Sequence, residues 1–234
     1  MKVTISVCIA TYNGEKYIKE QIDSILSQTI LPDEIIISDD NSTDNTIEII
    51  KSFNNPMIKI FKNNNKGIIK NFENALVNST GDYIFLCDQD DIWSNNKIEK
   101  IKEKLKEYDL VVHNAEIKYS NSQKDKNDLF NVYKSKKGII KNLYRNSYIG
   151  CCMAFNRKIL KNSLPFSKKI CMHDVWIGLV AEISGKVYFE KDILMLYRRH
   201  GENASLTCEK SKNSLYCKLK IRLNLLKEII KKLN

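Results

Sequence analysis

Several features typical of membrane, exported or nucleic-acid-binding proteins are missing from this sequence. None of its 234 residues fall in an apolar run that approaches the roughly 18 residues of a membrane-spanning helix. The first residues, MKVTISVCIATYNG, lack the cleavage pattern of a signal peptide. The seven cysteines are odd in number and include no CxxC pair, which favours reduced core thiols over disulfides or zinc ligands. We therefore expect an intracellular, cytoplasmic protein.

The basic charge is concentrated at one end of the chain. Lys and Arg number 38 against 28 Asp and Glu, a net charge of +10. Residues 208–234 hold eight Lys or Arg and two Glu, so this segment alone carries +6. The sequence contains neither a helix-turn-helix pattern nor an aromatic-studded sheet pattern to accompany that charge. We expect no nucleic-acid partner.

Short apolar runs alternate with helical patterns over the first hundred residues. Continuous Ile- and Val-rich runs predict strands that are buried on both faces, and apolar residues at helical spacing predict the helices that cover them. The predicted strands are residues 3–10, 33–39, 57–62 and 82–88, and the predicted helices are residues 15–28, 43–53 and 67–79. The expected fold class is therefore α/β, with a mostly parallel, Rossmann-like sheet flanked by helices.

The second half of the chain is less regular. It predicts a strand at 109–117, a strand-like stretch over 186–205 that ends in YRRHGENAS, a strand and helix within 148–160, and a helix over 173–183. The polar, lysine-rich residues 119–138 are typical of a surface loop. Residues 214–234 form a basic amphipathic helix, with Leu215, Leu219, Leu223, Leu226, Ile230 and Leu233 on one face. This helix packs on the rest of the protein, on a partner, or on an anionic membrane surface; packing is slightly favoured.

Polar clusters follow three of the predicted strands. They are TYNG at 11–14, DDNSTDNT at 39–46 and DQDD at 88–91. In parallel sheets, ligands bind beyond the carboxyl ends of the strands, so these clusters are expected to share one cleft. Singly, each has a simpler reading as turn or helix-capping chemistry. Carboxylates 4 Å apart repel by about 4 kcal/mol at an effective dielectric near 20, so the DQDD cluster indicates either a solvated turn or a divalent cation.

These segments resemble the family 2 glycosyltransferases with a GT-A fold. VCIATYNGEKYIKEQIDSILSQT, IIISDDNSTDNT and GDYIFLCDQDDIW carry the resemblance, and DQDDIW is similar to bacterial rhamnosyltransferase-type members. The resemblance implies a nucleotide-sugar donor, a divalent metal and sugar transfer to an acceptor hydroxyl. It divides the chain into a GT-A domain over 1–205, with a donor half at 1–100 and an acceptor half at 101–205, and a helical tail over 206–234.

Donor-binding roles follow from the resemblance, residue by residue. Tyr12 packs against the nucleotide base, with Thr11 and Asn13 nearby. Asp40 accepts the imide hydrogen of uracil or thymine; its simpler interpretation is a turn residue that hydrogen-bonds to its own backbone. The remaining donor residues are Asn71, Asp88, Asp90 and Gly150. Gly150 faces the donor sugar, with an ordinary glycine before a strand as the equal alternative.

The metal and the catalytic base are also implied by the resemblance. Asp90 of the DxD motif and His200 of YRRHGENAS hold the metal, Mn²⁺ or Mg²⁺, and imidazole suits Mn²⁺ better. Asp174, after His173, matches the carboxylate that takes the proton of the acceptor hydroxyl. Its simpler reading is a charge at a helix N-terminus.

The predicted function is inverting hexosyl transfer, of rhamnose or another sugar, from a dTDP- or UDP-sugar to a glycan or lipid-linked glycan. Cell-surface polysaccharide assembly in bacteria is the expected setting, with peripheral membrane contact through 214–234. A nucleotidyltransferase would share the sheet and carboxylates but needs a glycine-rich phosphate loop, for which TYNG is too short. A catalytically silent nucleotide-binding module would lack the base and the metal pair. The sequence leaves the sugar, acceptor, linkage and oligomeric state open.

Overall fold

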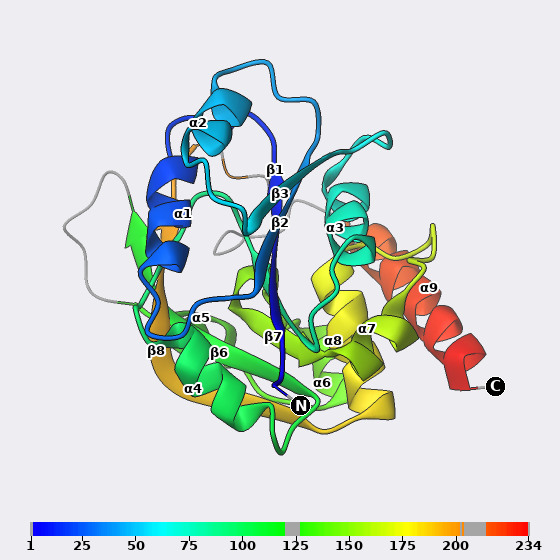
Figure 1. Ribbon diagram of the computed structural model, residues 1–234. Coiled ribbons are helices and arrows are strands. Elements are labelled where there is room, and N and C mark those ends of the chain that lie inside the picture. Colours follow the sequence, from blue (N-terminus) through cyan, green and yellow to red (C-terminus); the bar gives the residue numbers. More distant parts are fainter. Residues whose placement is uncertain (1, 120–126, 202, 204–213, 234) are drawn as a thin grey trace.

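The structure, a computed structural model, describes residues 2–119, 127–201, 203 and 214–233 (Figure 1). Strands and helices alternate through the first half and are more mixed in the second. In chain order the elements are β1 Ile5–Thr11, α1 Ile18–Leu26, β2 Glu34–Asp39, α2 Thr46–Ser52, β3 Ile58–Lys62, α3 Ile68–Val77, β4 Tyr83–Cys87, β5 Ile92–Trp93, α4 Lys97–Lys104, β6 Leu110–Tyr119, α5 Leu129–Tyr133, α6 Ile139–Tyr144, the 3-10 turn η1 Gly150–Cys152, β7 Met153–Asn156, α7 Arg157–Ser163, α8 His173–Ser184, β8 Val187–Arg199 and α9 Leu215–Leu233.

The strands of the described residues form a single mixed sheet. Its order is β3-β2-β1-β4-β7-β6-β8-β5. β1 pairs in parallel with β2 and β4, and β2 pairs in parallel with β3, so the carboxyl ends of these four strands meet at one edge. β7 runs antiparallel to both β4 and β6, whereas β6 and β8 are parallel. The predicted α/β class with a mostly parallel sheet is confirmed.

Helices cover both faces of the parallel half. Figure 1 shows α1 and α2 on one side of β1, β2 and β3, and α3 on the other. Every residue of β2 is buried, as are all but one of β1, because each strand is covered twice. That double covering explains why these strands read as unbroken apolar runs in the sequence.

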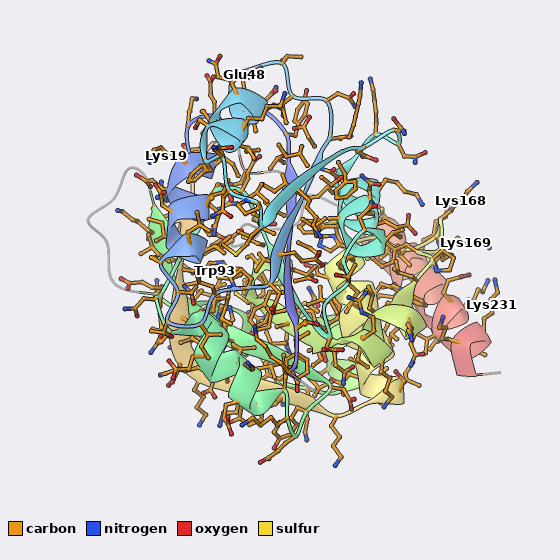
Figure 2. All side chains as sticks on the ribbon, viewed as in Figure 1. Lys19, Glu48, Trp93, Lys168, Lys169 and Lys231 are labelled. Carbon is orange, nitrogen blue, oxygen red and sulfur yellow. The ribbon has the colours of Figure 1, made fainter. Side chains whose placement is uncertain are left out.

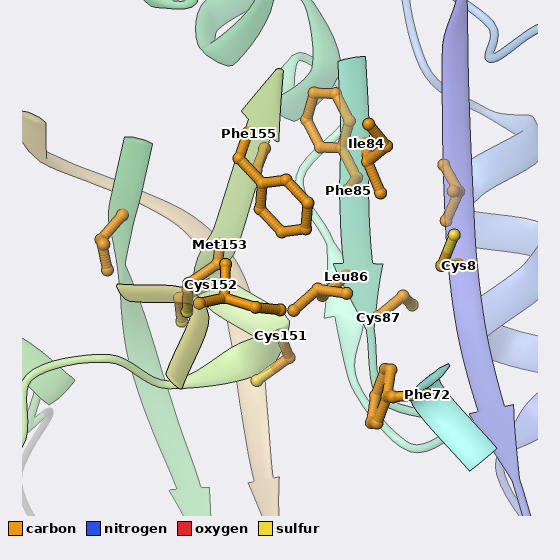
Figure 3. Close-up of a cluster of buried hydrophobic side chains, with 14 of the residues drawn as sticks. Cys8, Phe72, Ile84, Phe85, Leu86, Cys87, Cys151, Cys152, Met153 and Phe155 are labelled. Atoms are coloured by element: carbon orange, nitrogen blue, oxygen red, sulfur yellow. The ribbon is translucent and has the colours of Figure 1, made fainter. Parts of the chain in front are cut away.

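The core continues from the parallel strands into the antiparallel one. Figure 3 shows side chains of β1, β4 and β7, among them Cys8, Phe85 and Phe155, gathered between the strands with Phe72 of α3. Cys8, Cys87, Cys151 and Cys152 are buried, and all six cysteines of the described residues are free thiols. The predicted free thiols are confirmed for these six and their place in the core for four, because Cys171 and Cys217 are only partly buried; Cys208 lies outside the described residues.

β5, near the end of the first hundred residues, and several elements of the second half were not revealed by the sequence. The segment predicted as a loop, 119–138, contains α5, which buries Leu129, while residues 120–126 lie outside the described residues. β5 pairs antiparallel with β8, and α6 follows Gly138. The sheet runs from the first hundred residues into the second half without a break. The division of the GT-A domain at residue 100 therefore remains a prediction about function.

The helix α9 lies against α8 and α6. The expected packing is confirmed, but it uses a second face of the helix and not the predicted apolar stripe: Leu225 and Ile229 are buried, whereas Leu223 and Ile230 of the stripe are exposed. Residues 206–213 of the predicted tail lie outside the described residues. No helix of the described part of the chain is long and apolar enough to span a membrane.

Candidate active site

A cleft of about 360 Å³ opens beyond the carboxyl ends of β1, β2 and β4. Six of the predicted donor-binding residues line it: Thr11, Tyr12, Asp40, Asn71, Asp88 and Asp90. Ala10, Gly67, Ile68, Phe72, Gln89, Tyr197 and Asn203 complete the lining. The predicted convergence of three strand-end clusters is therefore confirmed for these side chains, while Asn13 and Gly150 lie outside this lining.

The loop after β1 is fastened to the DQDD turn. Gln89 accepts a hydrogen bond from Tyr12 N at 2.9 Å and donates one to Tyr12 O at 3.0 Å. Gly14 gives this side chain its space, because a Cβ there would lie 2.4 Å from Gln89 Oε1. The Tyr12 ring itself is exposed at the mouth of the cleft. An exposed ring on a fixed backbone is suited to stacking on a nucleotide base.

Asp40 and Asn71 form the opposite wall of the cleft. Asp40 accepts hydrogen bonds from Asn63 Nδ2 and Gly67 N, both at 2.8 Å, one on each oxygen. Each carboxylate oxygen can accept a second hydrogen bond, so Asp40 keeps capacity for a base N–H. Asn71 donates to Thr11 O at 3.0 Å, and its Oδ1 is a buried acceptor with no partner among the residues that the structure describes. Such an orphan beside a cleft indicates a place for a ligand donor.

Thr11 and Asn13 hold the loops together. The Thr11 hydroxyl donates to Asp39 Oδ1 at 3.1 Å, and the residue is buried. Asn13 lies in the left-handed region at φ 46° and accepts a hydrogen bond from Thr43 N at 2.9 Å. Their side chains are thus occupied within the protein, and they position the cleft wall.

The DQDD carboxylates are crowded and largely removed from water. Burial, and then the Asp90 charge, raises the pKa of Asp88 to about 7. Burial followed by the Asp90 and Asp88 charges raises the pKa of Asp91 well above its usual range. Asp91 accepts a hydrogen bond from Arg198 N at 3.1 Å, while its Oδ2 has no partner. Asp91 therefore ties the turn to β8 and caps no helix, since α4 begins at Lys97.

Lys97 supplies a buried positive charge behind the cluster. Its Nζ donates to Cys151 O at 3.0 Å and lies 3.7 Å from the centroid of the Trp93 ring. Burial lowers the pKa of Lys97, and the Asp91 carboxylate is among the groups that oppose this shift. The buried ammonium of Lys97 offsets part of the repulsion among these carboxylates.

The predicted metal pair is brought together. His200 Nε2 lies 3.0 Å from Asp90 Oδ2, and Asn203 Nδ2 donates to the same oxygen at 3.0 Å. Two ligands in neighbouring positions of an octahedral ion, each about 2.1 Å from it, lie about 3 Å apart. The oxygen and nitrogen of this pair therefore fit a divalent ion, with imidazole favouring Mn²⁺ over Mg²⁺.

A second group of potential ligand atoms lies next to this pair. Single ligand atoms of Asp88, Asp91 and Cys151 are within 4.8 Å of one another. The pKa of the Cys151 thiol is raised well above its usual range, chiefly by its hydrogen bond with Cys152 and by burial, so it is a poor ligand. A hard cation takes oxygen in preference to sulfur, which leaves Asp88 and Asp91; of these two, Asp88 lines the cleft together with Asp90 and can assist it.

Asp174 lies in the first turn of α8, against the η1 turn. Its Oδ2 accepts a hydrogen bond from Gly150 N at 3.2 Å and its Oδ1 one from Val175 N at 2.7 Å. Burial raises the pKa of Asp174 to about 6. The Asp174 charge in turn raises the pKa of Asp88, which indicates that the two carboxylates are neighbours. A carboxyl with this pKa is ionised at neutral pH and still basic enough to accept a proton.

Gly150 is required by its protein neighbours. A Cβ at Gly150 would lie 3.1 Å from His173 Nε2. The His173 ring stacks on Phe72 at 4.0 Å between centroids, and burial lowers its pKa to about 3. Phe72 lines the cleft, so this stack connects the helix of Asp174 to the cleft wall. The close approach at Gly150 is thus to His173; contact with a donor sugar stays a prediction.

Three residues of the site were not singled out from the sequence. Gln89 is the variable middle position of the DxD pattern, Asn203 follows the last strand, and Lys97 reads as one more lysine of a surface helix. Only long-range contacts give them a role, and nothing in their local spacing reveals it. Asn203 is the nearest to being predictable, because it stands in the same YRRHGENAS segment as His200.

The chain is similar to known glycosyltransferases in sequence. Residues 6–164 match the family model of glycosyl transferase family 2. The dTDP-rhamnosyl transferase RfbG of Shigella flexneri is 31% identical over 221 residues, which cover 83% of this chain and 72% of the relative. An uncharacterized glycosyltransferase of Nostoc is 28% identical over 227 residues, which cover 90% of this chain and 70% of that protein.

The fold is similar to that of solved glycosyltransferase structures. S. aureus TarS 1–349 in complex with UDP-GlcNAc has a TM-score of 0.70 at 18% identity, covering 98% of this chain and 66% of that chain. The mannosyltransferase PcManGT of Pyrobaculum calidifontis, with GDP-Man and Mn²⁺, has a TM-score of 0.67 at 18% identity, covering 87% and 59%. This chain thus spans about two thirds or less of those solved chains. Since the family model covers more than half of its residues and the fold is GT-A, the chain belongs to glycosyl transferase family 2.

Proposed function

We propose that this protein is an inverting glycosyltransferase that moves rhamnose or another hexose from a dTDP- or UDP-sugar to an acceptor hydroxyl. The acceptor is a glycan or lipid-linked glycan of a bacterial cell-surface polysaccharide, and the reaction takes place in the cytoplasm. One observation carries the proposal: a single cleft brings the exposed Tyr12 ring and the Asp40 carboxylate to the same edge as Asp88 and Asp90.

The nucleotide preference rests on Asp40. Uracil and thymine present an N3 hydrogen, and a carboxylate is a strong charge-assisted acceptor for it. Asp40 is held by Asn63 and Gly67 N, so its orientation is fixed before the ligand arrives. The relative from Shigella flexneri is named as a dTDP-rhamnosyl transferase, and TarS is solved with UDP-GlcNAc, which supports these two nucleotides.

Asp174 is the proposed general base. It takes the proton of the acceptor hydroxyl as that oxygen bonds to the anomeric carbon and the bond from this carbon to the diphosphate breaks. Attack from the face opposite the leaving group inverts the anomeric centre. Gly150 N and Val175 N hold the two carboxylate oxygens, so the base is oriented in advance. A Mn²⁺ or Mg²⁺ ion held by Asp90 and His200, assisted by Asp88, would supply positive charge for the departing diphosphate.

Thermal unfolding with nucleotides tests the donor site. A ligand present at about 100 times its Kd adds about 2.7 kcal/mol, which is about 5–10 °C in Tm for a chain of this size. We expect such a rise with UDP or dTDP in the presence of Mn²⁺, and a smaller one with GDP or ADP. The Asp90→Ala variant is expected to lose the part of the Tm rise that depends on Mn²⁺. The control Asp192→Ala removes only a surface ion pair with Lys100 and is expected to keep the full rise.

Mass spectrometry of products then tests the reaction. Incubation with dTDP-rhamnose or UDP-hexoses and glycan acceptors is expected to add one rhamnosyl or hexosyl residue to the acceptor and release the nucleoside diphosphate. Release of sugar 1-phosphate from these donors, or of pyrophosphate in a separate incubation with dTTP or UTP and a sugar 1-phosphate, would indicate a nucleotidyltransferase. Nucleotide binding without any transfer of sugar from a donor, either to a glycan acceptor or to water, would indicate a silent binding module. No Tm shift with any nucleotide would refute the donor cleft itself.

A further inference from the structure

The helix α9 has two apolar faces, of which the described residues cover one. Leu225 and Ile229 are 3% exposed and pack toward the body of the protein. Leu219, Leu223, Leu226 and Ile230 follow one another at spacings of four, three and four residues, which places them in one stripe. Their side chains are 39–54% exposed. Packing of α9 therefore leaves an open apolar stripe.

The helix α6 extends this stripe sideways. Its Ile140 and Tyr144 side chains are 85% and 76% exposed. Arg222 connects the two helices: its Nη2 donates to Tyr144 O at 2.9 Å, and its guanidinium lies 5.0 Å from the centroid of the Tyr144 ring. Arg222 directly precedes Leu223, so Tyr144 borders the stripe. We call the set Ile140, Tyr144, Leu219, Leu223, Leu226 and Ile230 the α6–α9 surface.

Positive charges surround the α6–α9 surface. Lys220, Lys227 and Lys231 each follow a stripe residue directly, so they lie one helical step of about 100° to its side. Figure 2 shows Lys168 and Lys169 projecting outward beside α9, on the same side of the molecule as Lys231. Within the described part of α9, Glu228 is the single acidic residue, and it is paired with Lys231 at 3.0 Å.

An apolar stripe bordered by lysines fits one kind of partner best. Helices of this pattern lie in the interface of lipid bilayers, with the apolar side chains below the headgroups and the basic ones at anionic headgroups. A second copy of this chain fits poorly, because a two-fold contact would bring the same lysines against each other. We propose that the α6–α9 surface binds the surface of an anionic lipid bilayer.

The position of α9 gives this contact a use. α9 packs on α8, and the first turn of α8 carries Asp174. A bilayer held by the α6–α9 surface is thereby attached to the helix that carries the proposed base. The relevance of this attachment to catalysis rests on the proposed function, since it concerns a lipid-linked acceptor. Binding to vesicles, by contrast, involves no sugar transfer.

Flotation with vesicles tests the inference on the whole chain. Vesicles of phosphatidylcholine alone are compared with an equimolar mixture of phosphatidylglycerol and phosphatidylcholine. We expect wild type to float with the mixed vesicles and to remain below with the neutral ones. Each basic residue near an anionic surface strengthens binding about fivefold, so Lys220→Glu with Lys227→Glu is expected to abolish flotation.

Substitutions in the apolar stripe, compared with a matched control, test whether insertion of these side chains into the bilayer contributes to binding in addition to charge. Leu223→Glu with Ile230→Glu is expected to lower partition into mixed vesicles at least about tenfold, because both lose apolar burial. Leu31→Glu is the control, since Leu31 is 48% exposed, like Leu223 at 47%, but lies between α1 and β2. It is expected to float like wild type.

Three results overturn the inference. They are absence of wild-type flotation with mixed vesicles, unchanged flotation of Leu223→Glu with Ile230→Glu, and a dimer in light scattering that this variant abolishes. The nucleotide-dependent Tm shift is measured on the same samples. A protein that keeps the shift but does not float loses this inference alone, and one that floats without the shift loses the proposed function.

Discussion

Replacing Asp174 by Asn tests two properties of this carboxylate: its proposed role as general base, and the free energy of folding that burial of its charge costs. The amide keeps the size of the side chain but cannot accept a proton at neutral pH. Loss of a general base lowers turnover about 10²–10⁴-fold. Nucleotide binding is expected to persist, because Asp174 is absent from the lining of the nucleotide cleft. Wild-type kcat/KM is expected to fall tenfold per pH unit below about pH 6, where Asp174 becomes protonated.

The same substitution is expected to stabilise the fold at neutral pH. Burial raises the pKa of Asp174 from 3.8 to about 6, and about two units correspond to about 3 kcal/mol. We subtract about 1 kcal/mol for the backbone hydrogen bond that the amide cannot accept, and a similar amount because the side chain is not fully buried. The net gain is about 1 kcal/mol, or about 2–4 °C in Tm.

The pH dependence of this gain has a definite sign. Between pH 3.8 and about 6 the folded protein holds a proton on Asp174 that the unfolded chain has released. Wild-type stability therefore falls as pH rises through this window, and the cost is complete above it. The Tm advantage of Asp174→Asn is expected to be full at about pH 8 and to vanish near pH 4.

Calorimetry and product formation by both proteins check this reasoning. Asp109→Asn is the matched control: its carboxylate accepts from Asn156 and Lys186 N, and these hydrogen bonds outweigh burial and lower the pKa. Asp109→Asn is thus expected to lower Tm at about pH 8, with turnover unchanged. Transfer by Asp174→Asn within about threefold of wild type would refute the base assignment. An equal loss of Tm in both variants would refute the burial argument.

Three further substitutions test the rest of the site. Asn203→Ala removes the amide that holds Asp90 beside His200 and is expected to weaken Mn²⁺ binding about 10–100-fold by isothermal titration; unchanged affinity would contradict the metal pair. Gln89→Ala frees the Tyr12 loop from two hydrogen bonds and is expected to raise the donor KM about tenfold with kcat nearly unchanged in steady-state kinetics; a fall in kcat alone would count against a binding role. Lys97→Met leaves Cys151 O unpaired beside buried carboxylates and is expected to cost about 3 kcal/mol in urea unfolding, whereas a neutral effect would show that the buried ammonium is dispensable.

The chain up to the end of β4 was predictable because each element there is locally specified. β1, β2, β3 and β4 are short apolar runs, and turn residues separate them from helices with an apolar stripe. The predicted strands and helices there agree with the structure to within about three residues at each end. The carboxyl ends of parallel strands must share an edge, so the positions of Tyr12, Asp40 and Asp90 followed from topology alone.

β5 and the second half of the chain depend on contacts that a linear pattern does not contain. β5 is two residues long and exists through its pairing with β8, and α5 is a helix of five residues inside a polar stretch. The sequence did not show by which face α9 packs, because two stripes of Leu and Ile run along it. Periodicity shows that both are apolar, while the neighbours α6 and α8 decide which is covered.

The double hydrogen bond between Gln89 and the Tyr12 backbone joins two binding events. Gln89 lies between Asp88 and Asp90, so in the proposed site a movement of these carboxylates toward an ion would reach the backbone of Tyr12, whose ring is proposed to stack on the base. Coupling of this kind is reciprocal: whatever factor the metal adds to nucleotide affinity, the nucleotide adds to metal affinity. Cellular nucleotide-sugar levels would thereby set how much metal the enzyme retains, and the protein would sense its donor through its ion occupancy.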